Sequence, residues 1–245
     1  MNPAEQQYMT GCYLQRHPSL HVEHSQWKAG QVAAMLQKHR IAPATMGDIG
    51  CGAGEVLVTL RTKFADCHFT GYEVSPLALE LCWPKEDSHL RFAMMDDLWQ
   101  SGVVFDVLLC LDVVEHVEDC FGFVRRLASK TRYAAFHFPL DLSVFGLLTR
   151  LPSRVRASAG HLHYFNRETA LSLVRECGFR IVDHTYTASA TEAPTSSWRT
   201  RAARWPRKLA SRVPRWGPHW ASTLLGGFSL LILAESETVR DRSVM

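Results

Sequence analysis

The fold of this chain is constrained most by a glycine-rich stretch near its N-terminus, residues 46–55, which reads MGDIGCGAGE. A β-prone run, 44–46, leads into the stretch, and a helical pattern, 56–60, follows it. Glycine has no Cβ, so the backbone can turn sharply here and a ligand can approach it closely. The N–H groups at the following helix start favour an anionic or strongly accepting ligand group. The stretch therefore predicts a strand, a tight turn and a helix that together bind a ligand.

The spacing of the glycines narrows the kind of ligand. Gly50, Gly52 and Gly54 form G-x-G-x-G, whereas a dinucleotide fingerprint has G-x-G-x-x-G and a P-loop ends in Gly-Lys-Ser/Thr. The string DIGCGAGE instead resembles motif I of the class I S-adenosylmethionine-dependent methyltransferases. That resemblance places the three glycines, Asp48 and Cys51 against the cofactor. The alternative is an ordinary glycine-rich turn between a strand and a helix.

An acidic residue follows the glycine turn at the sequence distance that is typical of nucleoside-binding sites. The second predicted strand, 68–74, ends at Glu73, roughly 20 residues after the glycine turn, as in dinucleotide sites. Ser75 and Pro76 then provide an N-cap and a first helical residue. A carboxylate at this strand tip can accept both hydroxyls of a ribose, and we assign Glu73 and the adjacent Val74 to the cofactor site. A surface glutamate at a strand end is the alternative.

A third predicted strand, 90–94, leads into Asp96, Asp97 and Leu98. In the methyltransferases that the chain resembles, an acidic residue here faces the adenine amino group, and a neighbouring backbone N–H meets a ring nitrogen. The sequence does not choose between Asp96 and Asp97. Two loop aspartates that cap a short helix are the alternative.

The apolar run 105–111 is typical of a central parallel strand buried on both faces. The longer string FDVLLCLDVVEHVED resembles motif IV of small-molecule methyltransferases, especially the ubiquinone-pathway O-methyltransferases. The resemblance places Cys110 and Leu111 at the methionine part of the cofactor. Asp112, Glu115 and His116 share one helical face and form a metal-site candidate in those relatives. We favour a capping aspartate with a His–Glu pair, and predict no metal.

Histidines supply the candidate catalytic bases, because their reference pKa of ~6.5 suits proton removal near neutral pH. His137 stands at the end of the fifth predicted strand, 132–138, and His161 and His163 lie in a long loop, 140–165, at the ligand-binding edge of the sheet. His116 ranks after these three. Many methyltransferases need no dedicated base, which leaves a structural role open for each histidine.

A basic, aromatic insertion interrupts the pattern at 188–223. No acidic residue occurs from 193 to 234, while arginines alternate with tryptophans and prolines forbid one long helix. Such a segment can bind an anionic or lipid-linked substrate or a membrane surface, and peripheral membrane contact is one prediction. Nucleic acid is less favoured because no known binding module accompanies the segment. A solvated loop is the alternative.

The alternation of strands and helices predicts an α/β, doubly wound sheet. The resemblance specifies a Rossmann-like, seven-stranded methyltransferase sheet of order 3-2-1-4-5-7-6. We expect one domain over 1–245, with an N-terminal helical lid, a cofactor-binding core, the insertion, and a last strand and tail. These parts cover residues 1–42, 43–187, 188–223 and 224–245, and within the lid a helix is expected from Ser25 to about Arg40.

Bulk properties set the remaining expectations. The hydrophobic content of 47% and charged content of 21% are those of a soluble globular protein, and a net charge of +3 identifies no partner. The seven cysteines are scattered without a C-x-x-C pair, which fits reduced thiols. The chain shows no signal peptide, and its longest apolar run is too short to span a bilayer. We therefore expect a cytoplasmic protein.

The sequence predicts methyl transfer from S-adenosylmethionine to a small molecule, with oxygen as the favoured acceptor. S-adenosylhomocysteine would be the product of the cofactor. A nucleic-acid or protein methyltransferase is disfavoured, because Leu111-Asp112-Val113-Val114 stands where an Asn/Asp-Pro-Pro-Tyr signature would follow the fourth strand. A non-catalytic cofactor-binding or membrane-associated protein on the same scaffold is the alternative from another class.

Overall fold

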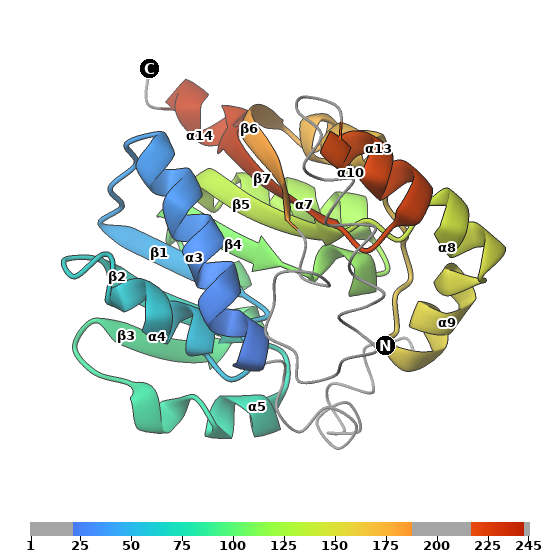
Figure 1. Ribbon diagram of the computed structural model, residues 1–245. Helices are drawn as coiled ribbons and strands as arrows, with labels where there is room; N and C mark the ends of the chain where they lie inside the picture. The colour runs from blue at the N-terminus through green and yellow to red at the C-terminus, as the bar shows by residue number, and fades with distance from the viewer. Residues whose placement is uncertain (1–21, 188–216, 243–245) are drawn as a thin grey trace.

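The computed structural model describes residues 22–187 and 217–242, and it contains a seven-stranded mixed sheet with helices on both faces (Figure 1). The strands lie in the order β3-β2-β1-β4-β5-β7-β6. Both the fold class and the strand order predicted from the sequence are thus confirmed. The strands are β1 Thr45–Ile49, β2 His68–Glu73, β3 Leu90–Met94, β4 Phe105–Leu111, β5 Thr131–Pro139, β6 Phe179–Thr187 and β7 Ser229–Ser236.

The strands β1 to β5 pair in parallel, and β7 runs antiparallel between β5 and β6. Parallel neighbours require crossover helices, which cover both faces of the sheet. The central strands are therefore apolar at almost every position: β4 is buried from Val107 to Leu111, and all of β7 is buried. This double burial explains why these strands read as continuous apolar runs in the sequence.

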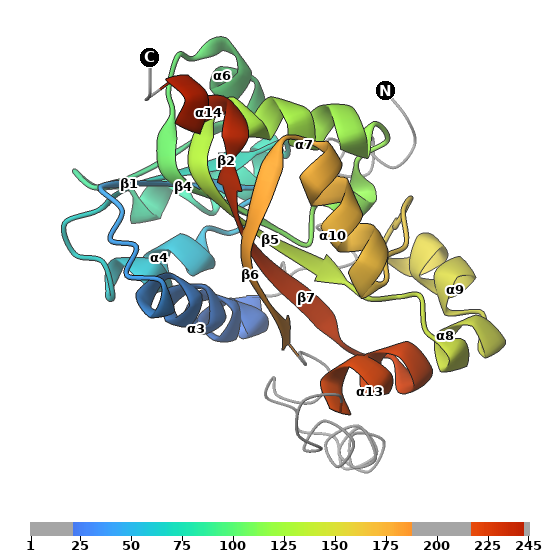
Figure 2. The same cartoon turned by 90° about the horizontal axis from the view of Figure 1, so that it is seen from above.

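Two apolar clusters, one on each face of the sheet, form the core. Helices cover both faces (Figure 2). One cluster includes buried side chains of α3, α4 and α5, and the other includes those of α6, α7 and α10. The bounds of these helices are α3 Val22–Lys38, α4 Glu55–Arg61, α5 Pro76–Glu80, α6 Met95–Gln100, α7 Cys120–Ala128 and α10 Arg167–Glu176. A 3-10 turn, η1 Trp83–Lys85, and a last helix, α14 Glu237–Arg242, complete this part of the chain.

The carboxyl ends of the parallel strands form one edge of the sheet, where open α/β proteins bind ligands. The strand order reverses between β1 and β4, and in open α/β sheets the ligand-binding crevice forms at such a point. The 3-10 turn η2 (Val114–His116) follows β4, and α8 (Val144–Leu148) and α9 (Leu151–Ser158) follow β5. Because Ser229 of β7 pairs with Pro139 of β5, α13 (Gly217–Leu225) also lies at this edge.

Several boundaries differ from those expected from the sequence. The segment expected to be a loop, 140–165, contains α8 and α9. The first helix among the described residues, α3, already includes Val22, so Ser25 is a buried residue within it instead of its cap. Of the predicted insertion, 188–216 lies outside the described residues, and 217–223 belongs to α13. Residues 1–21 of the predicted lid also lie outside the described part.

Two glycine-to-alanine substitutions with opposite expected effects test this packing. A Cβ at Gly71 in β2 would lie 2.5 Å from Cδ1 of Phe92 and 2.8 Å from Sγ of Cys51, whereas a Cβ at Gly30 in α3 would meet nothing within 4 Å. We expect Gly71→Ala to lower the free energy of unfolding by about 1–3 kcal/mol. Gly30→Ala should raise it by about 0.5–1 kcal/mol, because alanine favours a helix interior.

Urea unfolding followed by circular dichroism measures both changes. Equal effects of the two substitutions would contradict the described contacts of β2 with β3 and the glycine turn.

Candidate active site

The glycine-rich turn between β1 and α4 lies at the crevice and is built from left-handed backbone. Gly50, Gly52 and Gly54 have φ angles of 67°, 55° and 79°. These angles favour glycine, and space adds a second reason at two of the positions. A Cβ on Gly50 would lie 2.8 Å from Val113, which follows β4, and one on Gly54 would lie 2.5 Å from the ring of Phe92. The turn therefore brings bare backbone to the ends of β1 and β4.

The carboxylate of Glu73, at the end of β2, binds this turn. Its Oε2 accepts a hydrogen bond from the backbone N–H of Gly52 at 2.9 Å. Its Oε1 accepts from the N–H groups of Val74 and Ser75 at 2.8 and 3.0 Å. Burial raises the pKa of Glu73, and these three backbone hydrogen bonds oppose that shift. An acceptor group is thus fixed beside the glycine turn, at the position expected from the sequence.

The two aspartates after β3 have different environments. Both lie in the first turn of α6 and are exposed. Asp97 Oδ2 accepts a hydrogen bond from the N–H of Met94 at 3.2 Å and so caps the helix. Leu98 is buried in the core. Asp97 therefore has the helix-capping role that the sequence offered as the alternative to an adenine contact.

At the end of β4, Asp112 connects three other elements. Its backbone has a φ of 57°, which is unusual for a residue other than glycine. Its Oδ1 accepts a hydrogen bond from Nδ1 of His137 at 2.6 Å, and its Oδ2 lies 2.7 Å from Nζ of Lys28 in α3. Nε2 of His137 shares a hydrogen bond of 2.8 Å with the hydroxyl of Thr187 in β6. Lys28, Asp112, His137 and Thr187, named here the anchor network, join α3, β4, β5 and β6.

The anchor network holds charge in a buried place. Burial alone would raise the pKa of Asp112, but His137 and Lys28 hold it well below its ordinary range. Burial alone would lower the pKa of Lys28, but the Asp112 carboxylate raises it above the ordinary value. Trp27 packs edge-on against the His137 ring, with the ring centroids 6.2 Å apart. His137 is thus 4% exposed, with both ring nitrogens hydrogen-bonded.

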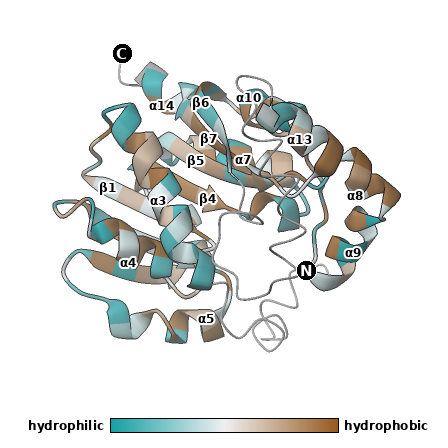
Figure 3. Ribbon diagram, in the orientation of Figure 1, coloured by the Kyte–Doolittle hydropathy of each residue, from teal (hydrophilic) through white to brown (hydrophobic). Residues whose placement is uncertain are grey.

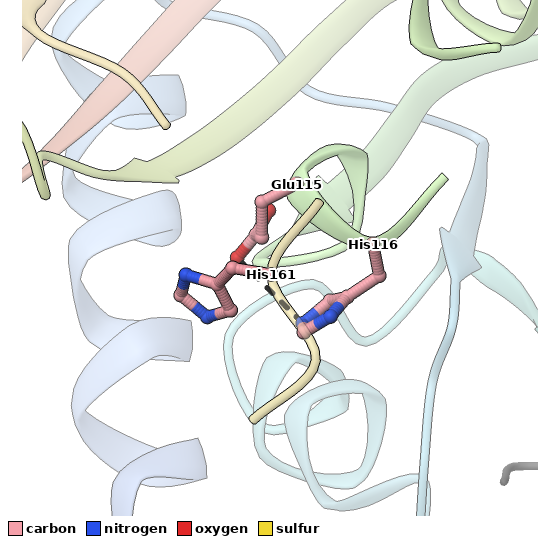
Figure 4. A group of neighbouring side chains, drawn as sticks. All are labelled: Glu115, His116 and His161. Atoms are coloured by element: carbon pink, nitrogen blue, oxygen red, sulfur yellow. Dashed lines mark ion pairs between the residues drawn. The ribbon is translucent and has the colours of Figure 1, made fainter. Parts of the chain in front are cut away.

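A second group of titratable side chains lies where η2 meets the segment after α9. Nδ1 of His161 donates to Oδ2 of Asp141 at 2.7 Å, and its ring stands edge-on to that of His116 at 5.0 Å. Nε2 of His116 is 4.0 Å from Oε1 of Glu115 (Figure 4). Backbone hydrogen bonds from Leu162 and His163 to the carbonyl of Glu115 hold the two segments together. We call Glu115, His116, Asp141 and His161 the acid–base cluster.

Burial sets the charge states within the acid–base cluster. Glu115 is 1% exposed, and its Oε2 has no hydrogen-bond partner among the described residues. Burial and then the nearby Asp112 carboxylate raise the pKa of Glu115 well above its ordinary value. Burial and then the charge of His161 lower the pKa of His116 to about 4. Near neutral pH, His116 is therefore a neutral imidazole, and Glu115 holds its proton more tightly than an ordinary carboxyl group does.

The third candidate histidine has a different environment. Nε2 of His163 donates to the backbone carbonyls of Val117 and Glu118, at 2.9 and 3.1 Å. These contacts hold the segment after α9 to the residues that follow η2. His163 thus contacts backbone, whereas His161 contacts two titratable side chains.

The structure brings together a different potential metal-binding group from the one considered in the sequence. Asp112 binds Lys28 and His137, while Glu115, His116 and His161 have ligand atoms that all lie within 4.8 Å of one another. The absence of a metal remains a prediction. Sequence spacing could not reveal that His161 joins the Glu115–His116 pair, because the two segments are far apart in the sequence. Next to His161, the Gly160 carbonyl accepts a hydrogen bond from Nδ1 of His116, which is 44 residues away. Lys28 and Asp141 carried no motif signal at all.

Comparison with known proteins identifies the family. A family model described as a methyltransferase domain matches residues 27–184, which is more than half of the chain. The chain belongs to this methyltransferase family. Its resemblance to class I S-adenosylmethionine-dependent methyltransferases is thereby confirmed, while the closer likeness to the ubiquinone-pathway enzymes remains an interpretation.

Two solved methyltransferases share the fold. Magnesium protoporphyrin IX methyltransferase from Synechocystis PCC 6803, with bound S-adenosylhomocysteine, superposes with a TM-score of 0.58 at 19% identity, covering 89% of this chain and 85% of that one. An N-methyltransferase from Bradyrhizobium japonicum WM9, also bound to S-adenosylhomocysteine, gives 0.54 at 17% identity, covering 85% of each chain. At these identities the likeness shows the fold.

A curated relative is similar over a shorter range. The protein named "Probable (S)-tetrahydroprotoberberine N-methyltransferase 2" of Papaver bracteatum is 25% identical in an alignment 138 residues long, which covers 49% of this chain and 35% of that protein. The match thus spans about a third of that relative's length. Among the described residues, no helix of this methyltransferase is long and apolar enough to cross a membrane.

The charge state of Asp48 gives a stability prediction. Burial, and to a smaller extent the charge of Glu73, raises the pKa of this β1 aspartate to about 7, against the opposing effect of Lys28. The unfolded value is ~3.9. A pKa raised by folding contributes stability that is present below the unfolded value and lost as pH rises through the folded value. Wild-type stability should therefore fall by roughly 2–4 kcal/mol relative to Asp48→Asn between pH ~4 and ~7.

Denaturant unfolding of both proteins across this range measures the difference. Taking the difference from Asp48→Asn cancels the titration of the other groups to the extent that they are uncoupled from Asp48. A difference that does not change with pH would contradict the burial of a neutral Asp48.

Proposed function

We propose that this methyltransferase transfers the methyl group of S-adenosylmethionine to a hydroxyl group of a small molecule. The sulfonium of the cofactor supplies an activated methyl group. The chain's own residues then have to bind the cofactor, orient the acceptor and remove its proton. The observation that carries the proposal is the Asp141–His161 pair beside the buried Glu115 at the ligand-binding edge of the sheet.

The cofactor would lie across the crevice between β1 and β4. Glu73 offers a buried carboxylate to the ribose hydroxyls, and the bare glycine turn leaves room for the rest of the nucleoside and the methionine part. Since Asp97 already caps α6, we assign Asp96 to the adenine amino group. Val74 is 40% exposed next to Glu73 and is suited to cover an adenine face. Cys110 and Leu111 end β4 beside this crevice.

His161 is the histidine best placed to act as the base. Its Nδ1–H donates to Asp141, so in the neutral ring Nε2 keeps a lone pair that can take a proton. A carboxylate that orients the imidazole in this way is the arrangement used by bases in other enzymes. Burial raises the pKa of the neighbouring Glu115, and in its protonated form Glu115 can donate a hydrogen bond to the acceptor. His137, by contrast, has both nitrogens engaged in the anchor network, and we assign it a positioning role.

A second acceptor class is supported by specific relatives. Both the curated relative and one solved neighbour are named as N-methyltransferases. An amine that is protonated in solution would also need to lose a proton to a base such as His161 before its lone pair could attack. Products identified by mass spectrometry after incubation with amine and hydroxyl acceptors distinguish the two.

Further features of the function remain predictions. They are a cytoplasmic location, an anionic or lipid-linked acceptor and contact with a membrane surface. A [4+2]-cyclase shares this fold with a TM-score of 0.55 at 13% identity, covering 84% of this chain and 80% of that one, so the fold by itself does not specify the reaction.

Substitution of Glu73 tests the cofactor site. Glu73→Gln should weaken binding of S-adenosylhomocysteine by roughly tenfold or more, because a charge-assisted hydrogen bond to the ribose is replaced by a neutral one. Isothermal titration calorimetry measures the change. The control is Glu80→Gln on the exposed side of α5, which should bind like wild type. Equal binding by all three proteins would exclude Glu73 as a ligand.

Substitution of His161 tests the proposed base. His161→Gln should lower kcat about 10²–10⁴-fold, the usual contribution of general-base catalysis, with little change in S-adenosylhomocysteine affinity. Rates are measured as transfer of radiolabelled methyl to a panel of phenolic, sugar and polyprenyl acceptors. The matched control, His163→Gln, loses only hydrogen bonds to backbone carbonyls and should retain most activity. The roles assigned here would be reversed if His163→Gln were the inactive variant.

The same assay tests whether the acid–base cluster holds a metal ion. If it acts as an acid and a base, chelation with EDTA should leave the rate unchanged. Loss of activity in EDTA, restored by zinc in the wild type and not in His116→Ala, would instead assign Glu115, His116 and His161 as metal ligands.

A further inference from the structure

Two helices at the ligand-binding edge expose large apolar side chains to solvent. In α8, Leu148 is 79% exposed and Leu147 is 57% exposed. In α13, Trp220 is 55% exposed and Leu224 is 47% exposed. The two helices contact each other, and they lie side by side in both orientations (Figure 1 and Figure 2). Figure 3 shows hydrophobic residues concentrated on them. We call these four side chains, with Val144 of α8, the apolar patch.

The charged side chains in the segments that form α8, α9 and α13 are all basic. Arg150 precedes α9, and Arg154 and Arg156 lie in it; all three are exposed. The sequence contains no acidic residue from 142 to 167, the range that includes α8 and α9, or from 193 to 234, the range that includes α13. Exposed leucines and a tryptophan beside arginines are typical of surfaces that enter the interface of an anionic bilayer.

We propose that α8 and α13 dock this protein on an anionic phospholipid bilayer, with the apolar patch inserted and the arginines of α9 at the phosphate groups. Charge complementarity favours this occupant over a second copy of the chain. A symmetric dimer through the patch would bring the arginines of one α9 near those of the other, and like charges in close contact weaken association. A bilayer offers negative phosphates next to an apolar interior, which matches both features of the surface.

The position of the patch gives the docking a functional consequence. Asp141 of the acid–base cluster lies three residues before the start of α8, and Gly146 in α8 donates its backbone N–H to Ser143 at 3.0 Å. Leu142 donates its N–H to the carbonyl of Phe165, just after the His161 segment. Docking through α8 would therefore turn the acceptor side of the site toward the bilayer, where an acceptor with a lipid tail would be found.

Sedimentation of the full chain with lipid vesicles tests the proposal. Wild-type protein should bind vesicles of equal parts phosphatidylcholine and phosphatidylglycerol, and bind pure phosphatidylcholine vesicles at least roughly tenfold more weakly. The double variant Leu147→Ser/Leu148→Ser should lose roughly tenfold or more of its affinity for the anionic vesicles. Arg154→Gln/Arg156→Gln should weaken binding and reduce its dependence on salt, because fewer head groups are neutralised.

A matched pair of exposed apolar residues provides the control. Val103 and Val104 are 43% and 44% exposed and precede β4, so they lie at the opposite edge of the sheet. Val103→Ser/Val104→Ser should bind vesicles like wild type. Retained S-adenosylhomocysteine binding and an unchanged circular dichroism spectrum show that each variant is folded. Because the vesicle assay measures binding and not methyl transfer, its result does not depend on the proposed acceptor.

Three results would overturn the proposal. The first is absence of wild-type binding to the anionic vesicles. The second is unchanged binding of the leucine variant, which would assign membrane contact to another part of the chain, such as the basic segment predicted around 188–216. The third is a wild-type protein that has no affinity for vesicles and instead forms a concentration-dependent dimer, detected by sedimentation velocity. The leucine substitutions would dissociate that dimer.

Discussion

The arrangement of the site depends on one partly buried ion pair, between Lys28 of α3 and Asp112 at the end of β4. The Asp112 backbone is left-handed, and such a conformation persists only where the surroundings determine it. Here Lys28 and His137 bind the two carboxylate oxygens, and the backbone N–H of Asp112 donates to the carbonyl of His137 at 3.0 Å. The pair thus fixes where the chain leaves β4 and where η2 begins, and it binds the first helix to that point.

The fixed charge of Asp112 also shapes the chemistry next to it. Two basic groups contact Asp112 and hold its pKa well below the ordinary range, whereas burial and the Asp112 charge raise the pKa of Glu115 well above it. Two carboxyl groups three residues apart therefore have pKa values shifted in opposite directions. Glu115 and the His161 imidazole, which Asp141 orients, lie together at this edge of the sheet.

The sequence predicted the features that local patterns encode. The glycine turn and Glu73 at the end of β2 follow from motifs whose spacing reflects backbone requirements, and the strand order follows from the family that those motifs resemble. It did not reveal α8 and α9, which are short helices within a segment of mixed composition, or the contact of Lys28 with Asp112. It named His161 but could not show that His161 meets Asp141 and His116. Those contacts join segments far apart in sequence and depend on the packing of the whole sheet edge.

A crystal structure of this methyltransferase with S-adenosylhomocysteine and an accepted substrate would test the central claim most directly. The account predicts the nucleoside ribose on Glu73, the thioether sulfur at the ends of β1 and β4, and the acceptor hydroxyl between that sulfur and Nε2 of His161, within ~3 Å of the nitrogen or one water away. An acceptor bound with its hydroxyl away from His161, or a cofactor that does not contact Glu73, would contradict it.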